Sequence, residues 1–89
     1  MLPIISQFFG IVIRMNFKDN DKHNLPHIHV GYAEYDAVFD LEGNLIKGEL
    51  PTKQQRLVKA WIEIRKDELK ANWNLTVNNE GYFKIDPLK

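Results

Sequence analysis

The amino-acid sequence predicts an α+β domain in which one long C-terminal helix packs on one face of an antiparallel four-stranded meander. Two patterns lead to this prediction. Apolar and polar residues alternate over residues 10–17 and 27–41, on either side of a polar loop, as they do in half-buried strands. Between residues 52 and 78 the apolar residues recur at helical spacing instead. Strands followed by a helix indicate separate sheet and helix layers, not alternating strand–helix units.

Length and composition fit a single domain over residues 1–89. The chain is 44% hydrophobic and contains ten aromatic residues (five Phe, two Trp, three Tyr), which is enough for one modest core. It has no cysteine, so disulfides and thiolate metal sites are excluded, and a reducing cytoplasm is the expected location. The apolar residues 1–13 lack the basic start of a signal peptide and are too few to span a bilayer, so we assign them to the core.

The predicted sheet begins with a strand over residues 10–17, which carries Arg14 on its polar side. Residues 27–32 and 35–40 form the next two strands, and a tight turn at Ala33 joins them. Gly43 and Asn44 both tolerate positive φ, so a second tight turn is expected there before a short strand over residues 45–48.

The predicted helix starts at Thr52, whose hydroxyl can cap it, with Gln55 completing a capping box. It ends between Asn72 and Asn78, where turn-forming residues begin. Its wide apolar stripe consists of Leu57, Val58, Trp61, Ile62, Leu69 and Trp73. Residues 82–85 could add a short edge strand to the sheet.

The candidate chemistry lies on the polar face of the second and third strands. His27 and His29 are two residues apart, so both imidazoles project from one face together with Asp36 and Asp40. Such a pair suits an acid and a base that flank one bond, or two ligands of one metal. The structural alternative is a set of half-exposed polar residues. If the first strand pairs with the second, Arg14 joins this face as a phosphate ligand or as an ion-pair partner.

Charge is unevenly distributed along a chain whose net charge is zero. Residues 18–49 contain three Lys/Arg against seven Asp/Glu, whereas residues 52–73 contain six Lys/Arg against three Asp/Glu. A solvated surface and two different binding faces both remain open. For contact with a partner, the candidates are Tyr32 and Tyr35 beside the turn and the basic residues Lys53 and Arg56 of the helix.

The whole chain resembles a family of small prokaryotic proteins, domain of unknown function 4160. The matching stretches are residues 5–15, 26–30, 34–40, 50–51, 72–73, 84–85 and 87–88, with Trp61 and Leu69. The most specific element is Pro-His-x-His followed by Ala-Val-Phe-Asp. The chain departs from the family pattern at Leu25, where proline is common, at Ala33, where glycine is common, and at Asp36, where a lysine-like residue is common. The resemblance implies a second small protein encoded nearby, an arrangement like that of a toxin–antitoxin pair.

These observations lead to one functional hypothesis and two alternatives. The hypothesis is a toxin-like, RNA-directed protein that acts with a genetically linked partner. His27 and His29 would be its acid and base, Arg14 would hold the phosphate and Asp40 would orient an imidazole. The alternatives are a non-catalytic protein-binding module and a metal-binding domain built on the His-x-His strand. No membrane association is expected, homo-oligomerisation stays open, and the sequence indicates no particular cofactor.

Overall fold

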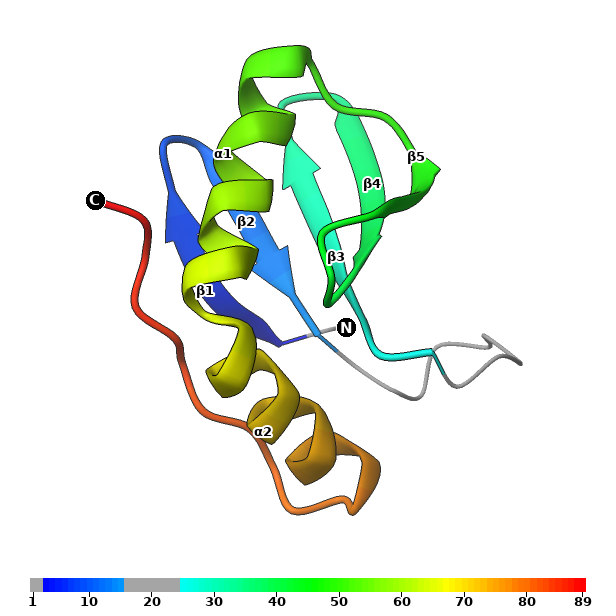
Figure 1. Ribbon diagram of the computed structural model, residues 1–89, viewed down its shortest axis with the longest axis vertical. Coiled ribbons are helices and arrows are strands. Elements are labelled where there is room, and N and C mark those ends of the chain that lie inside the picture. The colour runs from blue at the N-terminus through cyan, green and yellow to red at the C-terminus, as the bar shows by residue number, and fades with distance from the viewer. Residues whose placement is uncertain (1–2, 16–24) are drawn as a thin grey trace.

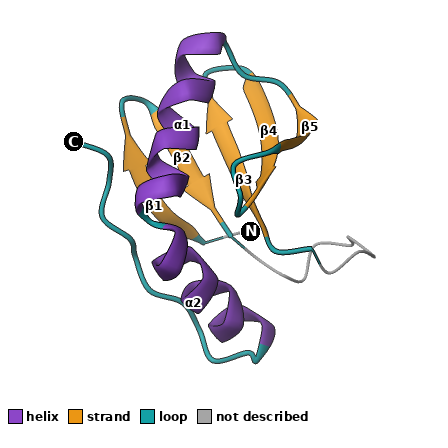
Figure 2. Ribbon diagram, viewed as in Figure 1, coloured by secondary structure: helices purple, strands orange, loops and turns teal. Residues whose placement is uncertain are grey.

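A computed structural model describes residues 3–15 and 25–89 and shows one antiparallel sheet beneath two consecutive helices (Figures 1 and 2). The five strands are β1 (Ile4–Phe8), β2 (Ile11–Arg14), β3 (His27–Tyr32), β4 (Tyr35–Asp40) and β5 (Leu45–Gly48), in the spatial order β1-β2-β3-β4-β5. The helices are α1 (Thr52–Ile64) and α2 (Lys66–Val77). The predicted α+β class and the antiparallel meander are therefore confirmed.

The sheet has five strands where four and a possible edge strand were predicted, because the apolar N-terminal stretch contains β1. A two-residue turn at Phe9 and Gly10, with φ of 50° and 80°, separates β1 from β2. Gly10 therefore lies in a turn, whereas the sequence pattern predicted it as the first residue of a strand. A register shift between Ile4 and Ser6 also hides the alternation of β1, because Ile5 and Ser6 are both buried. The predicted end of the first strand, residues 16–17, lies outside the described residues.

The long helix that the sequence predicts is interrupted at Arg65 (φ −106°, ψ 18°), which divides it into α1 and α2. Pro51 occupies the N-cap position without a side-chain cap, and Thr52 is already helical. The Gln55 side-chain amide donates to the Leu50 carbonyl at 3.2 Å, so the predicted capping box is not formed. The predicted C-terminal limit is confirmed by the end of α2 at Val77.

The segment after α2 runs back along the helices towards β1 without forming the expected edge strand (Figure 1). The Ile85 backbone N–H donates to the Ile5 carbonyl at 2.8 Å, which ties this segment to β1. The Trp61 indole N–H donates to the Asp86 carbonyl at 2.8 Å and ties it to α1. Residues 82–86 therefore act as an extended strap across helix and sheet.

The helices lie on one side of the sheet (Figure 2), and the core forms between them and the sheet. Fully buried strand side chains such as Ile13, Ile28 and Phe39 meet Val58 and Trp61 of α1 there. Because side chains alternate along a strand, this packing turns the polar side chains of the same strands to the opposite face. None of the helices among the described residues has the length and apolar character that a bilayer crossing requires.

Two turns set the register of the strands that carry the polar residues. Ala33 has a φ of 51° in the β3–β4 turn, which confirms the predicted turn position. In the β4–β5 pair, Val38 lies opposite Lys47, but Phe39 lies opposite Leu45, so Ile46 is an extra residue in β5. Gly48 has a φ of 78°, and a Cβ atom there would collide with the Asp36 carbonyl oxygen. Only glycine fits this close approach of β5 to β4.

Candidate functional site

A row of side chains crosses the face of the sheet opposite the helices. Arg14 of β2 lies opposite His29 of β3, which lies opposite Val38 of β4, which lies opposite Lys47 of β5. Neighbouring strands are about 4.8 Å apart, so the three basic groups fall within about 15 Å. The condition stated for Arg14 is therefore met, since β2 pairs with β3 and Arg14 lies opposite His29. We call Arg14, His29 and Lys47 the basic row.

The basic row lies in an open hollow of about 380 Å³ on the surface of the sheet. Its lining comprises Arg14, His29, Val30, Gly31, Asp36, Ala37, Val38, Lys47 and Gly48. Arg14 and His29 are half-buried, whereas Asp36 and Lys47 are exposed. Because Gly31 has no side chain, it leaves the space next to Asp36 open. The hollow therefore presents an imidazole and two cations beside one carboxylate.

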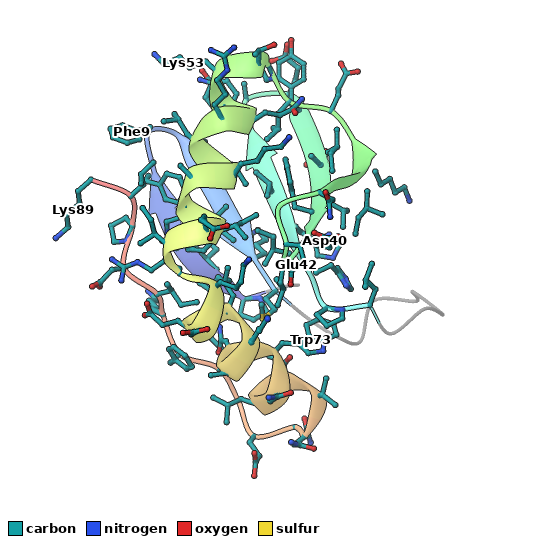
Figure 3. All side chains as sticks on the ribbon, viewed as in Figure 1. Phe9, Asp40, Glu42, Lys53, Trp73 and Lys89 are labelled. Carbon is teal, nitrogen blue, oxygen red and sulfur yellow. The ribbon has the colours of Figure 1, made fainter. Side chains whose placement is uncertain are left out.

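The two histidines lie side by side, as their spacing in the sequence predicts. Their ring centroids are 5.1 Å apart, and the rings are inclined by 72°. Their exposures differ, however, because only 2% of His27 is accessible. The ring of His27 lies 5.2 Å from Trp73 of α2, near the end of the sheet where Figure 3 labels that tryptophan. His29 is thus the imidazole that faces the hollow, and His27 lies behind it.

A hydrogen bond holds the buried imidazole in place. Nδ1 of His27 lies 2.6 Å from the Leu25 carbonyl oxygen. Because a carbonyl can only accept, Nδ1 must carry the proton and donate it. The carbonyl on one side and the Trp73 ring on the other fix the orientation of His27.

Asp40 is engaged by the β4–β5 turn. Its Oδ1 accepts the backbone N–H groups of Glu42 (2.9 Å) and Asn44 (2.8 Å), and its Oδ2 accepts the Asn44 side-chain amide (2.9 Å). Burial acts to raise the pKa of Asp40, but the hydrogen bonds from Asn44, Glu42 and Gly43 together outweigh it and lower the pKa. Asp40 lies opposite His27 in register, yet these bonds direct its carboxylate to the turn. Its catalytic role stays a prediction.

The residues predicted to contact a partner lie on the helix-covered side of the sheet. Tyr32 and Tyr35 are directly opposite each other, half-buried and packed against the core. Lys53 and Arg56 are exposed in the first turns of α1, where Figure 3 labels Lys53. The structure therefore separates these four residues from the basic row.

Sequence reasoning missed Lys47 as a member of the candidate site. The extra residue Ile46 in β5 decides which side chains of this strand lie beside Val38. A bulge of this kind has no reliable signature in a single sequence. The one available signal was a lysine next to glycine in an otherwise apolar strand.

A second hollow, of about 290 Å³, lies at the junction of sheet and α2. It is lined by Leu25, Pro26, Asp40, Leu41, Glu42, Lys70, Trp73 and Asn74. Its rim is closed by ion pairs in which Lys66 and Lys70 meet Glu42 at 3.0 and 3.7 Å. It includes neither His29 nor Arg14. Across residues 3–15 and 25–89, no three His, Asp or Glu side chains are grouped to hold a metal ion.

Comparison with known proteins gives one match. A family model described as Domain of unknown function (DUF4160) matches residues 10–74, from the β1–β2 turn to the last part of α2. The matched region contains every member of the basic row and His27. No curated protein and no solved structure matches the chain significantly.

Proposed function

This chain belongs to the DUF4160 family, whose description names no reaction, and we propose that it is an RNA-directed, toxin-like protein that acts with a genetically linked partner. The observation that carries the proposal is the basic row in an open hollow. Arg14 offers a planar fork for two phosphate oxygens, and Lys47 offers a second positive charge three strands away. Between them lies a half-buried imidazole, the side chain best suited to moving a proton near neutral pH.

The proposed reaction is cleavage of an RNA phosphodiester. In its neutral form His29 accepts the proton of a ribose 2′-hydroxyl, whose oxygen attacks the adjacent phosphorus. The new P–O2′ bond forms as the P–O5′ bond breaks, and the leaving 5′-oxygen takes a proton from water. Arg14 and Lys47 stabilise the negative charge on the phosphoryl oxygens as it grows.

In this proposal, His27 and Asp40 are positioning residues. His27 is too buried to touch a nucleic acid, but its ring, fixed by Leu25 and Trp73, supports the ring of His29. Asp40 holds the β4–β5 turn and thereby the start of β5, the strand that carries Lys47. The sequence predicted His27 and His29 as acid and base. In this proposal only His29 takes part in the reaction, and His27 holds it in position.

Purified protein incubated with end-labelled single-stranded RNA, and with DNA of the same sequence, tests the proposal. We expect cleavage of the RNA alone, because DNA lacks the attacking hydroxyl. His29→Ala should slow cleavage about 10²–10⁴-fold, the usual contribution of a general base. Lys47→Ala should weaken RNA binding and reduce the slope of log affinity against log salt by about 0.7. Lys59→Ala, on the exposed face of α1, is the matched control and should change neither.

Induction of the protein without its partner in a bacterial host provides the second test. We expect growth to stop, and expect His29→Ala and Arg14→Ala to restore it while the protein remains folded. Normal growth with intact RNA and continuing translation would contradict the proposal, and so would cleavage that survives His29→Ala.

A further inference from the structure

Exposed apolar side chains gather beside one flank of α1, on the opposite side of the sheet from the hollow. Phe9 in the β1–β2 turn is 61% exposed, and Ile64 at the end of α1 is 62% exposed. The exposed residues Ala60 and Ile64 lie on one line along α1 with exposed Lys53 and half-buried Leu57, at successive spacings of four, three and four residues from Lys53. Isolated exposed apolar residues are ordinary, but an aligned group marks a candidate interface.

Phe9 is exposed in a backbone conformation that disfavours it. Its φ of 50° lies in the left-handed region, where glycine and asparagine are the usual residues. The Phe9 ring contacts Phe8 edge-on at 6.4 Å, and Phe8 lies 5.4 Å from Trp61 of α1. These contacts place the turn next to the flank of α1, as Figure 1 also shows. The fold gains little from a strained, exposed ring, which suggests that the ring serves in binding.

A small hollow continues this surface at the far end of α1. It measures about 140 Å³ and is lined by Trp61, Ile64, Arg65, Pro87, Leu88 and Lys89. A cavity of about 150 Å³ can hold a benzene molecule, so this hollow has room for one apolar side chain. Figure 3 shows Lys53, Phe9 and Lys89 along the same side of the molecule.

Positive charge borders these apolar groups. Within the part of the chain that the structure describes, neither Lys53 nor Arg56 forms an ion pair. The first turn of α1 holds no acidic residue, so the positive end of the helix dipole adds to these cations. A negatively charged partner would offset this repulsion.

We propose that this surface, which we call the α1 flank (Phe9, Ala60, Ile64 and Leu88, with Lys53 and Arg56), binds an acidic amphipathic segment of a second protein. The partner's apolar side chains would cover Phe9 and fill the hollow at Ile64, and its carboxylates would meet Lys53 and Arg56. Aliphatic groups such as Ile64 and Leu88 suit a protein better than RNA, whose bases stack on aromatic rings. The inference rests on the proposed function only in taking that second protein as the partner. Its test measures peptide binding and not RNA cleavage, so the two can fail separately.

The test is an NMR titration of the ¹⁵N-labelled protein with a synthetic amphipathic peptide. The apolar face of the peptide carries leucine and phenylalanine, and its polar face carries only glutamate. We expect amide shift changes confined to residues 9–10, 53–64 and 88–89, and weaker binding as salt is added. A matched peptide with lysine in place of glutamate should not bind.

Variants locate the contact. Phe9→Asn removes the ring but suits the left-handed backbone, so it should fold normally and bind the peptide at least about tenfold more weakly. The double change Lys53→Glu with Arg56→Glu should abolish binding. Tyr82→Ser, which removes a 46% exposed side chain elsewhere, is the control and should leave binding unchanged.

Several outcomes would overturn the inference. These are an absence of shifts at the flank, equal binding of the lysine peptide, and unchanged binding by Phe9→Asn. Binding of phosphatidylserine vesicles or of single-stranded RNA at these residues in preference to the peptide would assign the flank to a different ligand. Self-association of the protein through the same residues would assign it to a second copy.

Discussion

The two helices follow each other directly in the chain but are attached to the rest of the molecule by different forces. α1 is attached by apolar packing, with Val58, Trp61 and Ile62 all buried against the sheet. In α2, the bonds of Asn72 and the ion pairs of Lys66 add polar attachments. The cations near the start of α1 have no such partner among the described residues. The lysines of α2 therefore use their charge within the fold, whereas Lys53 and Arg56 of α1 present theirs to the surroundings.

The largest expected effect tests the apolar attachment of α1. Trp61→Ala removes a fully buried ring and leaves the Asp86 carbonyl without its donor. We expect a loss of about 3–5 kcal/mol in the free energy of unfolding, measured by urea denaturation. If Trp61→Ala lowered the free energy of unfolding by less than Asn72→Ala does, the view that apolar packing attaches α1 and polar bonds help to attach α2 would be contradicted.

The next effect tests the polar attachment of α2. The Asn72 side-chain amide donates to the Phe83 carbonyl at 3.1 Å, and its oxygen accepts the Phe83 N–H at 2.9 Å. Asn72→Ala should therefore cost about 1–3 kcal/mol, because two backbone groups lose their partner. Asn74→Ala, an exposed change in the same helix, should stay within about 0.5 kcal/mol. Equal effects of the two would show that the bonds to Phe83 contribute nothing.

Acid should weaken the turn to which α2 is attached. The hydrogen bond and charge of Lys66 lower the pKa of Glu42 from 4.5, and Asp40 also has a lowered pKa. Carboxylates with lowered pKa values stabilise the fold above their ordinary pKa, and this contribution disappears as pH falls through the folded pKa. The urea midpoint should therefore fall below about pH 4.5.

Neutral substitutions identify which carboxyl groups cause this loss. Combining Asp40→Asn with Glu42→Gln should flatten the decline of the urea midpoint, whereas Glu80→Gln, the control, should not. A decline of the same steepness in the double variant would assign acid sensitivity to other groups.

The smallest effect concerns the lysines themselves. Lys66→Ala and Lys70→Ala should lower the melting temperature slightly at low salt and not at 1 M NaCl, because their pairs with Glu42 are exposed and screened. Lys53→Ala and Arg56→Ala should not lower it at either salt concentration, since they break no ion pair. If Lys53→Ala or Arg56→Ala lowered the melting temperature, these two cations would be shown to stabilise the fold.

The parts of the fold that could be predicted are those with a strong local pattern. The alternation on both sides of Ala33 gives β3 and β4 correctly, and helical spacing gives the buried face of α1. The break at Arg65 was unpredictable, because arginine is a good helix former and no glycine or proline marks the position. The strand β1 was missed because its bulge buries two successive residues.

The candidate site was predictable only in part. Side chains alternate between the two faces of a strand, so the local sequence is enough to place His27 and His29 on one face. That His27 would be covered while its neighbour stays open depends on Trp73, which lies 46 residues away in the sequence (73 − 27). The position of Lys47 depends on the bulge at Ile46, and the engagement of Asp40 depends on the exact turn. Such tertiary details have no counterpart in local sequence patterns.

The bond between Ile85 and Ile5 has a consequence for the growing chain. The outer edge of β1 leaves the ribosome before the strap that covers it, because the strap follows the other four strands and both helices in the chain. Until then, the nascent protein displays an unpaired row of peptide groups, to which a chaperone or a neighbouring nascent chain could add a strand. Loss of the strap would prolong that exposure indefinitely, so truncated forms should aggregate during translation.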